Sequence, residues 1–202
     1  MRSRRTLLLP VPLLAALALA AACNADPVHT TAVNALGPEV AGFPTGEFHR
    51  AGQPCLLCHG GEGPASSQFV VAGTVFFGPA STSPPVGVGN VNVTLEDDTQ
   101  SQFTVQTNCV GNFVVRPGDW PGHPQFPMLV TISGMPQTQQ LTLSMKSHIG
   151  RAGSCADCHQ YPTDQNYFMT PGLIYMSAMD DPSYQGDQTC AVSPIPAGYG
   201  AP

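Results

Sequence analysis

Apolar and polar residues alternate with a period of two along the middle of the chain. Between residues 67 and 146, six short apolar or alternating stretches are separated by turn-forming Gly, Pro, Asn and Ser. These stretches are 68–77, 86–96, 102–107, 112–115, 128–132 and 140–145. A helical period is not visible. The pattern predicts a mainly β fold, a small antiparallel β-sandwich of about six or seven strands.

Two loop-rich segments flank this β region, and they repeat one another. Residues 46–66 contain "HRAGQPCLLCHG", and residues 147–182 contain "HIGRAGSCADCHQ". Each copy has a histidine, then Arg-Ala-Gly, then Cys-x-x-Cys-His. An even number of up-and-down strands returns the chain to the end where it started, so we expect both segments at the same end of the sandwich.

The amino-terminal residues have the pattern of an export signal. Residues 1–22 begin with basic side chains and continue as an apolar run that ends in small residues. The run resembles a bacterial lipoprotein signal, with Cys23 as the lipid-bearing first mature residue. We therefore expect a periplasmic or outer-membrane, cell-surface protein. Residues 23–45 are predicted to be a flexible tether and residues 183–202 a C-terminal tail.

Charge narrows the choice of partner. Four basic residues remain after residue 22, against 13 acidic ones. This excess of acidic groups argues against nucleic acid and against anionic lipid surfaces, and membrane contact is expected only through a lipid anchor. It suits a basic protein partner or a cationic substrate.

The repeated Cys-x-x-Cys-His is the attachment signature of c-type haem. Two thiols three positions apart reach the two vinyl groups on one porphyrin edge, and the next residue places its imidazole under the iron. The motif predicts two covalently attached haems, with iron bound by His59 and His159. The six attachment residues are Cys55, Cys58, His59, Cys155, Cys158 and His159.

Two other uses of Cys-x-x-Cys fit less well. A zinc site normally has its pairs close together in the chain, whereas these pairs are a hundred residues apart, and zinc leaves both adjacent histidines unexplained. A thioredoxin-like pair opens a helix in an α/β pattern, which is not visible here.

Two cysteines remain after haem attachment and lipidation. In an exported, oxidising compartment, Cys109 and Cys190 are predicted to form a disulfide that ties the tail to the middle of the chain. The alternative is two unpaired buried thiols.

The second axial ligand of each iron sets its potential and decides between electron transfer and small-molecule binding. His49 lies six positions before Cys55, and His148 lies seven before Cys155, so we predict both as distal ligands. Chain length does not decide which haem each serves. The other candidates are His29, in the tether, and His123, Met169, Met176 and Met179, for which surface or packing roles are expected; Arg50 and Arg151 are candidates for pairing with haem propionates.

The middle section resembles the carboxypeptidase-regulatory-like β-sandwich family over roughly residues 70–116. "VAGTVFF", "VNVTLEDD" and "TVQTNCVGNFVV" stand where that family has its Gly-x-Val, its long second strand and its Asp-Gly-x-Phe hairpin. The chain differs at Cys109-Val110-Gly111, where the family has an acidic turn. The resemblance implies a scaffold without chemistry of its own.

With its two haem motifs, the chain resembles dihaem c-type cytochromes, small exported proteins that pass single electrons to redox partners or an external acceptor. That resemblance implies an electron carrier rather than an enzyme. Two alternatives stay open. One is a haem enzyme, either a dihaem peroxidase or a sulfur-compound oxidoreductase, although those families usually carry their motifs in helical domains. The other is a redox sensor or a subunit of a haem-wired homo-oligomer or filament.

Overall fold

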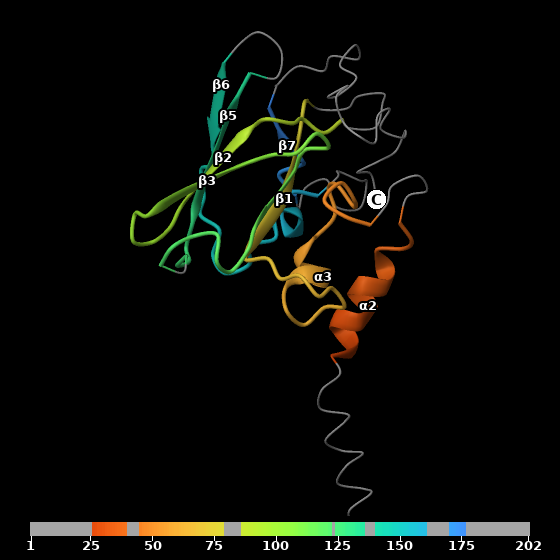
Figure 1. Cartoon of the computed structure of the whole chain (residues 1–202). Helices are drawn as coiled ribbons and strands as arrows, with labels where there is room; N and C mark the ends of the chain where they lie inside the picture. Colours follow the sequence, from red (N-terminus) through yellow and green to blue (C-terminus); the bar gives the residue numbers. More distant parts are fainter. Residues whose placement is uncertain are drawn as a thin grey trace, which may run out of the picture.

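The structure is a computed structural model, and it describes residues 26–39, 45–78, 86–122, 124–135, 140–160 and 170–176. This part of the chain is mainly β and forms two sheets packed as a small sandwich (Figure 1). The strands are β1 (Val71–Phe76), β2 (Asn92–Glu96), β3 (Gln102–Gln106), β4 (Asn112–Val115), β5 (Leu129–Gly134), β6 (Leu141–Ser144) and β7 (Ile174–Tyr175). Helices α2 (Pro27–Ala35) and α3 (Leu56–His59) and the 3₁₀ turn η1 (Cys155–Asp157) lie outside the sheets.

Strand β1 is the middle strand of the smaller sheet, whose order is β4-β1-β7. It pairs antiparallel with β4, which sets Thr74 opposite Asn112, and parallel with β7. The larger sheet, in the order β3-β2-β5-β6, is antiparallel throughout. The predicted sandwich is therefore confirmed, and each of the six predicted stretches contains a strand.

The expected up-and-down order is wrong, because β1 pairs with β4 and β7 rather than with β2. The predicted strand 86–96 is divided between the two sheets. Gly87 forms a bridge with Phe76 in the smaller sheet, whereas Asn92–Glu96 belongs to the larger one. A side chain on Gly87 would collide with the backbone of Val110, so glycine lets the chain pass close to the neighbouring turn while it changes sheets.

The core lies between the sheets and follows from the period-two pattern. On β2, Val93 and Leu95 are buried while their neighbours are partly exposed, and β5 alternates in the same way. Strand β1 is buried along its whole length. Full burial of an aliphatic side chain of this size contributes about 1.5–3 kcal/mol, so the sandwich supplies a rigid support for the flanking segments.

Residues 27–35, which were expected in a flexible tether, instead form helix α2. Asp26 caps its amino terminus by accepting hydrogen bonds from the backbone N–H groups of Val28 and His29, and Pro27 occupies the first turn. The helix packs beside α3 (Figure 1). Its start signal, Asp-Pro, is in the sequence, but its apolar face is too narrow for a clear helical period.

None of the helices in the described part of the chain is long and apolar enough to cross a membrane. The predicted export signal at residues 1–22, the proposed lipidation residue Cys23 and the whole predicted tail at residues 183–202 lie outside the described residues.

Candidate functional site

The two Cys-x-x-Cys-His motifs form the same local structure. In each one, the backbone N–H of the histidine donates to the carbonyl of the first cysteine, His59 to Cys55 at 2.9 Å and His159 to Cys155 at 2.8 Å. This single turn brings the two cysteines and the histidine of each motif close together in the chain's path. The sequence repeat is thus also a structural repeat.

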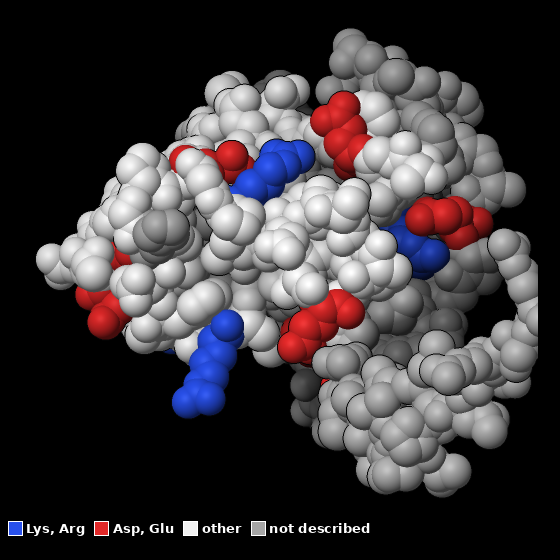
Figure 2. Space-filling view, turned by 60° about the horizontal axis from the view of Figure 1, so that its bottom comes forward, with Lys and Arg blue, Asp and Glu red and all other residues white. Residues whose placement is uncertain are grey.

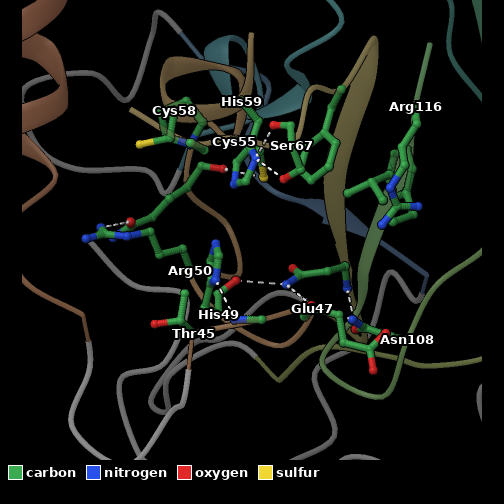
Figure 3. A pocket seen from close by; sticks show the side chains of 18 of the residues that line it. Thr45, Glu47, His49, Arg50, Cys55, Cys58, His59, Ser67, Asn108 and Arg116 are labelled. Carbon is green, nitrogen blue, oxygen red and sulfur yellow. Dashed lines mark hydrogen bonds between the residues drawn. The ribbon is translucent and has the colours of Figure 1, made fainter. Parts of the chain in front are cut away.

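The first motif opens onto a large cavity. Its volume is about 880 Å³, within the range of small-molecule and cofactor sites. One wall comes from α2, through Val33 and Leu36, and another comes from β3 and β4 (Figure 3). Cys55, Cys58, His59 and His49 all line it. The donor set and the space both fit a c-type haem.

His49 and His59 lie one above the other in this cavity (Figure 3). Their ring centroids are 5.9 Å apart, and the ring planes differ by 21°. Two imidazoles on one iron have ring centroids a similar distance apart, since each ligating nitrogen lies about 2 Å from a first-row metal. They also point their ring nitrogens at the metal edge-on, so the stacked rings of His49 and His59 have to turn before both can bind one iron. The structure thus places the predicted distal histidine beside the proximal histidine of its own motif.

His59 is oriented by its surroundings. Its Nδ1 lies 2.8 Å from the carbonyl oxygen of Ser67 and 3.0 Å from the Ser67 hydroxyl. Because a carbonyl can only accept, Nδ1 carries the proton, and Nε2 presents its lone pair to the cavity. Phe69 stacks on the ring at 4.1 Å, and the Arg116 guanidinium lies 5.7 Å from the centre of the Phe69 ring. Sequence reasoning missed Ser67, Phe69 and Arg116, for which the motif spacing gives no signal.

His49 is held differently. The backbone N–H of Gly46 donates to His49 Nδ1 at 3.1 Å, so in the neutral ring Nε2 carries the proton. Binding iron through Nε2 requires the ring to release this bond, which costs about 1 kcal/mol. Burial lowers the pKa of His49, and His59 and Arg50 lower it further, while Glu39 opposes them. These effects favour the neutral ring, the form that ligates metals.

The second motif has a different environment. Cys155 is buried, and a side chain on Gly73 of β1 would come within 2.8 Å of its sulfur. Cys158 is exposed. His159 Nδ1 donates to the carbonyl of Gly172 at 2.9 Å, which repeats the Nδ1 contact of His59. The proximal histidine therefore fits a haem, whereas one of the two thiols faces strand β1.

His148 is not paired as His49 is. It is exposed and lies next to Ile149, which forms a bridge with Met128 at the start of β5. The 5.9 Å pairing of His49 with His59 has no counterpart between His148 and His159 in the part of the chain that the structure describes. The predicted distal roles of His49 and His148 thus receive unequal support.

Strand β1 holds both motifs. The N–H of Gly52 donates to Thr74 Oγ1 at 2.8 Å, and the N–H of Ala72 donates to the carbonyl of Gly153 at 2.9 Å. These glycines end the two Arg-Ala-Gly copies, so both copies dock within three residues of one strand. The two segments are therefore neighbours, as expected, although a shared strand rather than an even strand count brings them together.

The two leading thiols are protonated in this fold. Burial, with smaller contributions from the nearby Cys58 and Asp157, raises the pKa of Cys55 to about 11, although a backbone hydrogen bond opposes this change. Burial, with a smaller contribution from the nearby Cys55, raises the pKa of Cys155 to about 12. The two thiols thus lie within electrostatic range of one another.

The other candidates fall into two groups. Arg50 lines the cavity, and its guanidinium binds Glu39, Gln53 and the carbonyls of Leu36 and Gly37, so it also fastens the segment that follows α2. Arg151 is exposed, and Met176 is fully buried in the core. Cys109 is disulfide-bonded. Its predicted partner Cys190, together with His123, Met169 and Met179, lies outside the described residues.

His29 belongs to α2 instead of a tether. Its Nε2 is buried without a hydrogen-bond partner in a hollow of about 300 Å³, between the first motif and Asp157 of the second. The hollow is lined by His29, Leu56, Leu57, Gly60, Glu62 and Asp157. Neither here nor anywhere else among the described residues do three His, Cys, Asp or Glu side chains come close enough together to hold a metal ion.

On the face drawn in Figure 2, acidic side chains are separated from one another, and some of them lie against basic side chains. Electrostatic steering of a basic partner therefore finds no single acidic patch on this face.

No protein family, curated protein or solved structure matches this chain.

Proposed function

We propose that the protein is an exported dihaem c-type cytochrome that transfers single electrons and carries out no bond chemistry on a substrate. The observation that carries this proposal is the first cavity. It brings two histidines into facing positions beside a pair of thiols, within a space of about 880 Å³. Six-coordinate iron between two imidazoles suits electron transfer, because neither axial position is left for a substrate.

Each side chain of the first site has a role in this proposal. Cys55 and Cys58 would hold the porphyrin, and His59 and His49 would be the ligands of its iron. When bound, the haem supplies a reversible one-electron couple at iron. Ser67 fixes the tautomer of His59, and Phe69 restricts its rotation. Arg50 and Arg116 both line the cavity and are the cations available to a propionate; Arg116 is the less engaged of the two, since its ion pair with Asp119 spans 3.9 Å whereas Arg50 lies 2.9 Å from Glu39.

The arrangement of the thiols supports haem over zinc. A structural zinc site draws four Cys or His ligands to one point, at about 2.0–2.3 Å from the metal. Although Cys55 and Cys155 are neighbours, three such ligands do not converge anywhere among the described residues. Haem instead uses each pair separately, with its own histidine.

A second candidate function is small-molecule chemistry at the second haem. The exposure of His148 and the absence of a paired imidazole beside His159 in the described part of the chain favour an open position on that iron. An open position would allow peroxide or sulfur compounds to bind the iron, as in a haem enzyme. If another copy of the chain supplies the second ligand instead, the haem serves electron transfer and the two molecules are linked. An iron with an open position is high-spin, whereas an iron with two strong axial ligands is low-spin, so the spin state distinguishes these cases. Dilution removes a ligand that comes from another copy of the chain but not one from the same chain.

Burial of Cys155 bears on how the haem is attached. A protonated thiol packed against β1 does not react, because the thiolate is the nucleophile. We therefore expect attachment at Cys155 to precede folding of this segment. That order agrees with export of an unfolded chain to the periplasm or cell surface, as the signal-like residues 1–22 predict.

The direct test is the mature protein from a host that makes c-type cytochromes. Its mass should include two haems, and an alkaline pyridine spectrum should show two haem c per chain. Ferric electron paramagnetic resonance should show at least one low-spin centre, which assigns two strong axial ligands to that iron. A colourless protein with the mass of the bare chain would refute the proposal.

A further inference from the structure

An unusual polar pair lies inside the smaller sheet. Thr74 of β1 and Asn112 of β4 are opposite one another, with 5 % and 8 % of their surface exposed, at positions where a sandwich normally buries apolar side chains. A buried amide is tolerated only when its hydrogen-bonding atoms find partners. The partners of Asn112 therefore indicate what the pair does.

The amide of Asn112 binds the segment that carries His49. Its Oδ1 accepts from the Thr74 hydroxyl at 2.7 Å. Its Nδ2 donates to the carbonyl of His49 at 3.0 Å and to that of Glu47 at 3.2 Å. Thr74 in turn accepts from the N–H of Gly52 at 2.8 Å. These bonds hold the backbone on both sides of His49.

The turn that precedes β4 completes the arrangement. Asn108 donates to the carbonyl of Glu47 at 2.7 Å, and its Oδ1 accepts from the N–H of Asn112 at 3.0 Å. The next residue, Cys109, is disulfide-bonded, which anchors the turn. Two asparagines, one on each side of this turn, thus bind the segment that carries His49.

We propose that Asn112, supported by Thr74 and Asn108, positions His49 over His59 and so determines whether the iron at His59 receives a second imidazole. The inference rests on the proposed function, because it assumes that His49 ligates iron. Asn112 touches only the backbone of His49 and is a positioning residue. Only an amide meets the requirement, since the site needs one acceptor for Thr74 and two donors for the carbonyls.

The test compares Asn112→Asp with Asn90→Asp in the haem-loaded protein. The first change keeps the shape of the side chain and removes both donors, whereas Asn90 is exposed on the loop before β2 and receives the same change in charge. We expect Asn112→Asp to reduce the six-coordinate low-spin fraction of the first haem about tenfold and to speed carbon monoxide binding to the ferrous form about tenfold. Asn90→Asp should match the wild type.

If Asn112→Asp does not fold, a second pair of variants, at Thr74, tests the positioning role of this polar pair. Thr74→Val removes the hydroxyl at nearly constant shape, and Thr74→Ser retains it. Thr74→Val should shift the spectrum in the same direction as Asn112→Asp, and Thr74→Ser should restore the wild-type spectrum. Haem content and circular dichroism confirm that each variant is folded and loaded.

His49→Ala separates the two levels of the proposal. If His49→Ala leaves the spectrum unchanged, or if haem is absent from the wild type, the proposed function itself fails. If His49→Ala removes low-spin character while Asn112→Asp and Thr74→Val both match the wild type, the positioning role of Asn112 is wrong and the proposed function stands.

Discussion

The two Cys-x-x-Cys-His segments share a sequence, a turn and a supporting strand, yet they lie in different surroundings. Around the first, α2, residues 45–53 and β4 enclose a cavity with a second histidine inside it. Around the second, the first cysteine packs against Gly73, and the preceding histidine is exposed. The pentapeptide therefore determines the turn and the proximal histidine, whereas the rest of each site depends on what the fold packs against it.

The largest expected effect comes from removing the thiols of one motif at a time. Cys55→Ala with Cys58→Ala should abolish attachment of the first haem and leave the second, because each pair serves one porphyrin. Cys155→Ala with Cys158→Ala should do the converse. The measurement is the intact mass together with haem staining after denaturation. Loss of both haems from either double variant would show that the sites are not separate.

Thiol reactivity should distinguish the buried and exposed cysteines of the second motif. In protein made without haem, a pKa of about 12 leaves roughly one Cys155 thiol in ten thousand ionised at pH 8. Iodoacetamide should therefore modify the exposed Cys158 at least about a hundredfold faster than Cys155. Peptide mass spectrometry over time gives both rates. Equal rates would contradict the packing of Cys155 against β1.

The packing of Cys155 against Gly73 should affect the free energy of unfolding. Gly73→Ala places a methyl group 2.8 Å from the sulfur, and such overpacking typically lowers the free energy of unfolding by about 1–3 kcal/mol. Gly118→Ala is the matched control, because a side chain there would meet nothing within 4 Å. Urea unfolding measures both variants. A neutral Gly73→Ala would mean that the second segment shifts easily and that its environment resembles that of the first.

The sequence predicted the β-strands well, because a strand that is buried on one face shows a visible alternation of apolar and polar residues. Val93 and Leu95 on β2, and Val130 and Ile132 on β5, alternate with partly exposed neighbours, and the positions of these strands followed directly from the sequence. Strand order did not follow, because a residue such as Gly87 can carry the chain from one sheet to the other without interrupting the alternation.

The candidate site was predictable where the chemistry is local and unpredictable where it is not. The two Cys-x-x-Cys-His motifs are visible from their spacing, and His49 is visible as a candidate ligand from the repeat. The contacts of Asn112, Ser67 and Gly73 join segments that are distant in the chain or fix a backbone carbonyl, and a single sequence carries no sign of them. His49 and His148 occupy equivalent positions in the two sequence repeats, so the difference between their surroundings comes from tertiary packing and is not visible in the sequence.

The facing of His49 and His59 is the central claim, and ferric electron paramagnetic resonance tests it most directly. Wild type, His49→Ala and His148→Ala should be compared at equal haem content. The account predicts that His49→Ala converts one low-spin centre to a high-spin one, while His148→Ala leaves that centre low-spin. A wild-type low-spin signal that survives in His49→Ala and is lost in His148→Ala would contradict the account.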